Sequence, residues 1–95
     1  MNLSVGVLYD SQKFIALCET KAFRLDDVRR AFQHRYEAAP IGAVLEIIRA
    51  ANWIHFEDEG LLRLTDRGRQ ILECRDAVLA LRLQLMDFIE IVKPT

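Results

Sequence analysis

The sequence has 95 residues, a length that suits one domain and leaves no room for a second hydrophobic core. Apolar residues make up 52% of it, more than so small a core can enclose, so we expect apolar side chains on the surface. The formal net charge of -1 excludes a global basic field that would draw the chain to nucleic acid or to an anionic membrane.

The spacing of the cysteines and the character of the apolar segments indicate in which cellular compartment we expect the protein. Cys18 and Cys74 lie far apart and belong to no Cys-x-x-Cys motif, a pattern typical of reduced core residues in a cytoplasmic protein. We expect no signal peptide, because no basic segment precedes an apolar one near the N-terminus. The most apolar segment, Ala77–Val92, is too short and too charged to span a bilayer.

The first quarter of the chain predicts an extended segment and then a helix. Apolar residues alternate in Met1–Tyr9, which favours a short strand or an extended segment. A helix is expected from Gln12 to about Lys21, with Asp10 or Ser11 as its cap. Phe23–Leu25 would connect this helix to the next.

A second helix is expected to begin at Asp26 and Asp27, whose charges favour the positive end of a helix dipole. Its outward side and its exit are basic, and these residues are candidates for contacts with DNA phosphates: Arg29, Arg30, His34, Arg35 and Tyr36. The alternative is a solvated face whose arginines pair with the neighbouring acidic residues, which is ordinary on a protein surface.

The third predicted helix runs from Pro40 to about Asn52. A helical projection places small or acidic residues on its outer face, together with Arg49 and Trp53. Reading base edges needs side chains with hydrogen-bond donors and acceptors, and only Arg49 supplies them well on this face. Arg49 is therefore the one candidate for base recognition.

A β-hairpin follows. Ile54 and Phe56 alternate with polar residues, as do Leu62 and Leu64, and the acidic tip Glu57–Gly60 ends in a glycine that can adopt a positive φ. Three carboxylates at such a tip oppose contact with a phosphate backbone.

The hairpin leads into Leu64-Thr65-Asp66-Arg67-Gly68, in which Thr65 can cap a new helix and Gly68 falls in the first turn, where a glycine costs little. Helix, two-stranded hairpin and a helix opening on this motif resemble a winged helix-turn-helix domain. The resemblance covers residues 12–73 and implies an α+β fold with a core of three helices and a two-stranded wing. We expect a single domain, residues 1–95, in which residues 74–93 form a C-terminal helix for association. Domains of this family most often bind DNA as dimers and regulate transcription. A large minority are interaction modules in nucleic-acid machines, including the small winged-helix subunits of chromosome-organising ATPase complexes.

The C-terminal segment lacks proline from Thr65 to Pro94, so one long helix, or two in line, is expected to reach about Val92. Two apolar stripes lie roughly 150° apart on it, and a surface helix needs only one. The first has heptad spacing, and both are candidates for a dimer or partner interface: Val78, Leu81, Leu85, Phe88 and Val92 in the first, Leu79, Leu83 and Met86 in the second.

No catalytic constellation is recognisable. His34 and His55 belong to separate elements, neither cysteine has a base nearby in sequence, and no Gly-rich loop follows a strand, so we predict no enzyme, no metal site and no cofactor. Two hypotheses remain. The first is a dimeric DNA-binding regulator or DNA-associated subunit, which the family's usual role favours by a narrow margin. The alternative is a non-enzymatic protein-interaction subunit of a larger nucleic-acid-handling complex.

Overall fold

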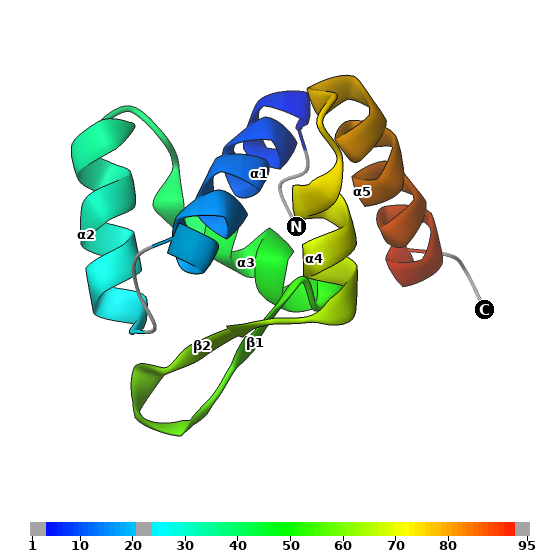
Figure 1. Cartoon of the computed structure of the whole chain (residues 1–95). Coiled ribbons are helices and arrows are strands. Elements are labelled where there is room, and N and C mark those ends of the chain that lie inside the picture. The colour runs from blue at the N-terminus through cyan, green and yellow to red at the C-terminus, as the bar shows by residue number, and fades with distance from the viewer. Residues whose placement is uncertain (1–3, 21–23, 93–95) are drawn as a thin grey trace.

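The computed structural model describes residues 4–20 and 24–92, apart from the side chains of Thr20 and of residues 90–92. Within these ranges five α-helices and a two-stranded antiparallel sheet follow one another in the order α1-α2-α3-β1-β2-α4-α5 (Figure 1). The expected α+β class is confirmed, and the arrangement is compatible with a winged-helix domain. The hairpin projects from one end of the helical body.

Helix α1, Val5–Thr20, is the central element and packs against α2, α3, α4, α5 and β2. The expectation of an extended segment up to Tyr9 is wrong from Val5 onward, and residues 1–3 lie outside the described ranges. The helix begins early because Ser4 caps it: its hydroxyl oxygen accepts a hydrogen bond from the Val7 backbone N–H at 3.1 Å.

The buried residues of α1 recur at helical spacing, which explains its true length. They are Val7, Leu8, Ser11, Phe14, Ile15, Leu17 and Cys18. Ser11, expected as a cap, lies inside the helix and donates its hydroxyl hydrogen to the Val7 carbonyl at 2.8 Å. The polar Ser11 interrupts the apolar residues of this buried stripe, so the spacing of the apolar residues did not predict a helix before it.

Helices α2, Leu25–Arg35, and α3, Ile41–Ala51, agree with expectation to within one or two residues. Helix α2 buries Val28 and Phe32, and α3 buries Val44, Ile47 and Ile48. Asn52 ends α3 in the left-handed conformation at φ 58°.

The wing consists of β1, Ile54–Phe56, and β2, Leu62–Leu64, with Ile54 opposite Leu64. Both strands show the expected alternation: the first residue is buried, the second exposed and the third half-buried. Arg24 forms an isolated antiparallel bridge with Leu61, so the connector before α2 does join the wing. At the tip Glu59 and Gly60 both have positive φ, 65° and 74°.

Helix α4, Asp66–Glu73, has the expected cap: the Gly68 N–H donates to the Thr65 hydroxyl oxygen at 3.0 Å. Gly68 has a further role. A Cβ at this position would overlap the Trp53 carbonyl oxygen and lie 3.0 Å from its carbonyl carbon, so only glycine lets α4 approach the end of α3 this closely.

Helix α5, Ala77–Val92, does not continue α4. The chain leaves helical geometry at Cys74, and Asp76 caps α5 by accepting the Val78 N–H at 2.8 Å. The two helices lie side by side, with Arg67 at the start of α4 in contact with Asp87 of α5 (Figure 1). The expectation of one long helix, or two in line, is therefore wrong.

Candidate association face on the C-terminal helix

The inward face of α5 carries two polar side chains among apolar ones. Gln84 is completely buried, one helical turn from Ala80 and one from Phe88, which are both buried as well. Its amide nitrogen donates to the Leu8 carbonyl at 2.9 Å, and its amide oxygen accepts from the Gln12 side chain at 2.7 Å. A buried amide with both ends hydrogen-bonded holds α5 against α1 in one orientation.

A second polar anchor lies one turn further on. Asp87 accepts a hydrogen bond from the Trp53 indole N–H at 2.6 Å and pairs with the Arg67 guanidinium at 2.8 Å. Hydrogen bonding to this carboxylate raises the pKa of Arg67. The Trp53 ring meets Phe88 edge-on, with centroids 5.7 Å apart. Asp87 therefore ties together the end of α3, the start of α4 and α5.

Trp53 was expected on the outer face of α3, and that expectation is wrong. The side chain is completely buried. The left-handed turn at Asn52 breaks the helical projection, so the residue after it points to the core.

The outward face of α5 is apolar. Of the six large hydrophobic side chains exposed within the described ranges, five belong to this helix, and the sixth, Val5, lies on α1. Their exposed fractions are 57% for Val78, 50% for Leu79, 38% for Leu85, 57% for Met86 and 62% for Ile89. At 100° per residue they surround Arg82 on the side opposite Gln84. Helix α5 is thus apolar on both sides. Ala80, Leu81, Leu83 and Phe88 accompany Gln84 and Asp87 toward the core, and five large apolar side chains face solvent, although a helix on the surface of an isolated domain needs only one apolar face.

In the structure each of the two predicted stripes contains both exposed side chains and side chains buried or half-buried against the core. Phe88 is buried, and Leu81 and Leu83 are half-buried against the core, whereas Val78, Leu79, Leu85 and Met86 are exposed. The side chain of Val92 lies outside the described ones. Ile89 was overlooked, although it lies four residues after Leu85 at the spacing of the same face. The prediction used Gln84 and Asp87 only to separate the two stripes, whereas in the structure both side chains face inward.

The predicted DNA-contacting residues of α2 point in several directions. Arg29 pairs with Asp26 at 3.4 Å, and both are well exposed. Arg30 and His34 border a shallow depression with Asp27. Arg35 and Tyr36 instead line a groove beside α1. Arg29 and Arg35 lie about 120° apart around the helix, so they cannot face one flat surface together.

Arg49 lies elsewhere, on α3. Its guanidinium stacks over the Phe56 ring of the wing at 4.2 Å. The exposed surroundings on α3 and at the wing tip include Glu46, Asp58 and Glu59, while Glu57 pairs with Arg63 at 3.1 Å. Arg49 therefore packs against the wing and is not among the residues that line the groove with Arg35 and Tyr36.

The described ranges contain no group of three or more His, Cys, Asp or Glu side chains that could hold a metal ion. No helix in the same ranges combines the length and the apolar character needed to cross a membrane. No protein-family model matches the sequence, and neither a curated protein nor a solved structure matches it.

Proposed function

We propose that this chain is a winged-helix protein-association module, and that it pairs with a second copy of itself through the outward face of α5. The exposed apolar face of α5 carries the proposal: Gln84 and Asp87 orient the helix through contacts on its core side, and five exposed apolar side chains face away from the core. The fold supports it because α5 is additional to the helices and hairpin of a winged-helix core.

The spacing on this face suits a helix pair. Val78, Arg82, Leu85 and Ile89 recur at intervals of four, three and four residues, which is the spacing of a two-helix seam. The long aliphatic part of Arg82 can lie along the seam while its charge reaches solvent at the edge. The net charge of -1 adds little repulsion between copies.

The exposed area predicts a weak dimer. The exposed fractions on α5 add up to between two and three fully exposed side chains, so burying them stabilises by about 4–8 kcal/mol per copy. Association costs about 4–15 kcal/mol in lost translational and rotational freedom. Burial over both copies, about 8–16 kcal/mol, overlaps this cost, so the face can support a reversible dimer but not a permanent one.

The test is sedimentation velocity from about 1 to about 500 µM, a range that detects association free energies of about 4.5–8 kcal/mol. The wild-type chain is expected to change from monomer to dimer, and Leu79→Glu with Met86→Lys is expected to stay monomeric with unchanged helicity. Leu79 is preferred to the half-buried Leu83, because a charge at Leu83 would disturb the core. Gln33→Glu with Ala38→Lys introduces the same charges at exposed positions away from α5 and should dimerise normally.

A wild-type chain that remains monomeric over the whole range would overturn the proposal of self-association. If the control variant lost the dimer to the same extent, the introduced charges would prevent association wherever they are placed, and the result would not identify α5 as the interface.

A second candidate function is binding to double-stranded DNA through the backbone phosphates. Its supporting observation is that α2 exposes four basic side chains: Arg29, Arg30, His34 and Arg35. The acidic wing tip opposes this function, since carboxylates near phosphates weaken the counterion release that drives binding.

Salt-dependent binding tests this candidate. If α2 contacts phosphates, Arg30→Ala and Arg35→Ala should each flatten the dependence of affinity on salt by about one unit, whereas Arg49→Ala should change sequence preference. Replacing the wing-tip residues Glu57, Asp58 and Glu59 with lysine should strengthen non-specific binding. Unchanged affinity of the two α2 variants at low salt would remove DNA from consideration.

A further inference from the structure

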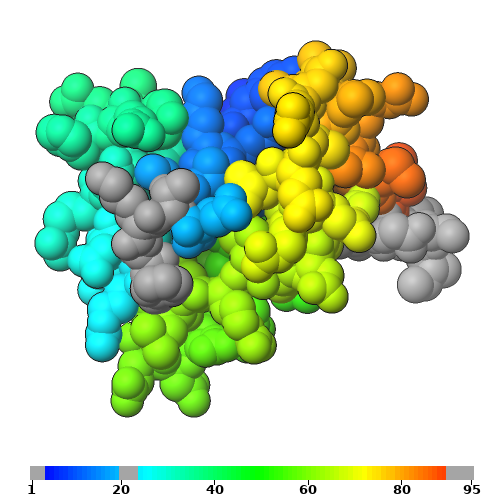
Figure 2. Space-filling model, in the orientation of Figure 1, coloured from blue at the N-terminus to red at the C-terminus, as the bar shows by residue number. Residues whose placement is uncertain are grey.

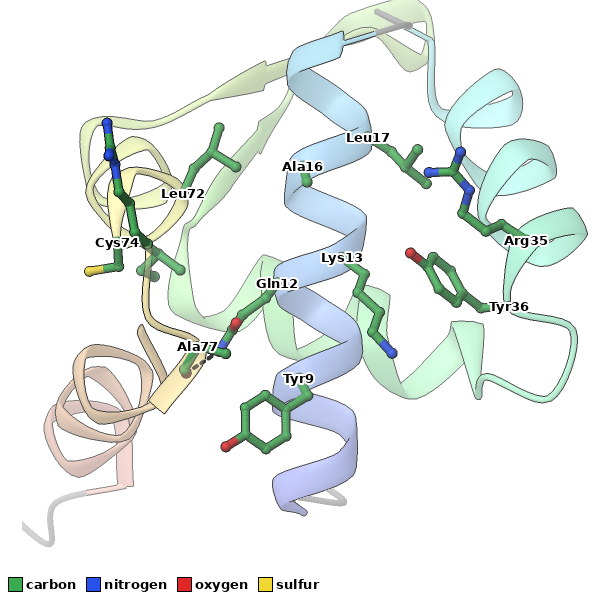
Figure 3. Close-up of a pocket in the computed structure, with 12 residues that line it drawn as sticks. Tyr9, Gln12, Lys13, Ala16, Leu17, Arg35, Tyr36, Leu72, Cys74 and Ala77 are labelled. Atoms are coloured by element: carbon green, nitrogen blue, oxygen red, sulfur yellow. Dashed lines mark hydrogen bonds between the residues drawn. The ribbon is translucent and has the colours of Figure 1, made fainter. Parts of the chain in front are cut away.

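A groove of about 660 Å³ runs along the outer side of α1 (Figure 3). The C-terminal end of α2 forms one wall, and α4 with the first residues after it forms the other. Figure 2 shows the described surface of this region, where α1 lies between these elements. Of α5 only Ala77 borders the groove, so this surface is distinct from the outward face of α5.

The floor of the groove is apolar. Ala16 is half-buried on the side of α1 that faces the groove, between the two walls, and its small side chain leaves the space open. Leu17 and Ile71 are almost fully buried at its base, and Leu72 projects from the α4 wall. A volume of this size with an apolar base is within the range of ligand sites in proteins.

The rim of the groove is cationic. Lys13, Arg35 and Arg75 line it, and its lining includes no aspartate or glutamate. Lys13 lies over the Tyr36 ring at 4.8 Å and pairs with Asp10 at 3.6 Å, so its charge is partly used within the chain. Arg35 and Arg75 are exposed and belong to opposite walls. A ligand lying along the floor would therefore meet a positive charge on each side.

We infer that this groove binds an acidic, amphipathic segment of a partner protein. Its apolar side chains would cover Ala16 and Leu72, and its carboxylates would pair with Arg35 and Arg75. The part of α1 that lines the groove, from Tyr9 to Leu17, is about 12 Å long, which is the length of two turns of a helix or of four extended residues. The lining of the groove carries positive charge and apolar surface but no carboxylate. Charge complementarity therefore favours an acidic segment as the ligand.

Fluorescence anisotropy with a labelled peptide tests the inference. The probe is a 12-residue synthetic peptide that alternates glutamate pairs with leucine and phenylalanine, and the comparison peptide carries lysine in place of every glutamate. The acidic peptide is expected to bind the full chain, and the basic peptide is expected not to bind.

Charge reversal locates the site. Arg35→Glu with Arg75→Glu should weaken binding of the acidic peptide about tenfold or more. Arg30→Glu with Arg69→Glu changes the net charge by the same amount, outside both the groove and the outward face of α5, and should leave the affinity within about twofold. Ala16→Phe fills the floor without changing charge and should also reduce binding, with thermal melting to confirm that the variant is folded.

Three results would overturn the inference. They are equal binding of the acidic and basic peptides, equal loss of affinity in the two charge-reversal variants, and displacement of the peptide by duplex DNA that itself needs Arg35 and Arg75. The last result would assign the groove to a polyanion. None of them depends on whether the chain dimerises through α5.

Discussion

Replacing Asp87 tests whether its polar contacts hold α5 in place. In Asp87→Ala the Trp53 indole N–H, in a fully buried ring, loses its acceptor, and Arg67 loses its partner. A hydrogen bond to a charged group contributes about 1.5–3 kcal/mol, and the ion pair, with Arg67 30% and Asp87 19% exposed, adds about 1 kcal/mol. The free energy of unfolding should therefore fall by about 3 kcal/mol, which corresponds to at least about 12 °C in Tm for a domain of this size.

Urea denaturation measures this loss directly. Trp53 is the only tryptophan, so its fluorescence reports on the site itself. Asp87→Asn keeps an acceptor for the indole and should lose about half as much stability as the alanine variant. Asp26→Ala is the control: Asp26 pairs with Arg29 at 3.4 Å but is 73% exposed, so the loss of this pair and of its charge at the start of α2 should be about 1 kcal/mol or less. A loss in Asp87→Ala no larger than in this control would refute the view that Asp87 anchors α5.

Two further outcomes follow from the core. Gly68→Ala should destabilise by about 2 kcal/mol or more, because the new Cβ would overlap the Trp53 carbonyl, while Arg69→Ala on the exposed side of α4 should be nearly neutral in the same urea titration. Burial raises the pKa of the Cys18 thiol from 9.0 to about 12, so iodoacetamide should label the half-buried Cys74 first, as peptide mass spectrometry would show. Above pH 9 the unfolded chain ionises Cys18 while the folded chain does not, so stability should fall as pH rises, by about 1 kcal/mol at pH 10 relative to Cys18→Ala. Rapid labelling of Cys18 in the native chain, or no difference between the two chains at pH 10, would contradict this account.

Local signals in the sequence determined α2, α3, the wing and the cap of α4. The aspartates at the start of α2, the alternation in both strands and the Thr65 hydroxyl act within a few residues along the chain, so they are readable without a tertiary structure. The excess of apolar residues also predicted exposed hydrophobic surface near the C-terminus, and α5 carries it.

Other features depended on contacts between distant parts of the chain. The early start of α1 follows from a buried stripe interrupted by Ser11, whose hydroxyl is satisfied by its own helix. The groove along α1 joins residues from α2 and from the α4–α5 connection, and no spacing in the sequence relates Arg35 to Arg75.

The orientation of α5 was decided by tertiary structure alone. Periodicity locates apolar stripes on a helix, but it cannot tell which side meets the core when polar residues find buried partners elsewhere. Gln84 bonds to Leu8, 76 residues away, and Asp87 bonds to Trp53, 34 residues away. These hydrogen bonds offset the cost of burying an amide and a carboxylate, and with Gln84 and Asp87 turned inward a second apolar face of α5 is left toward solvent.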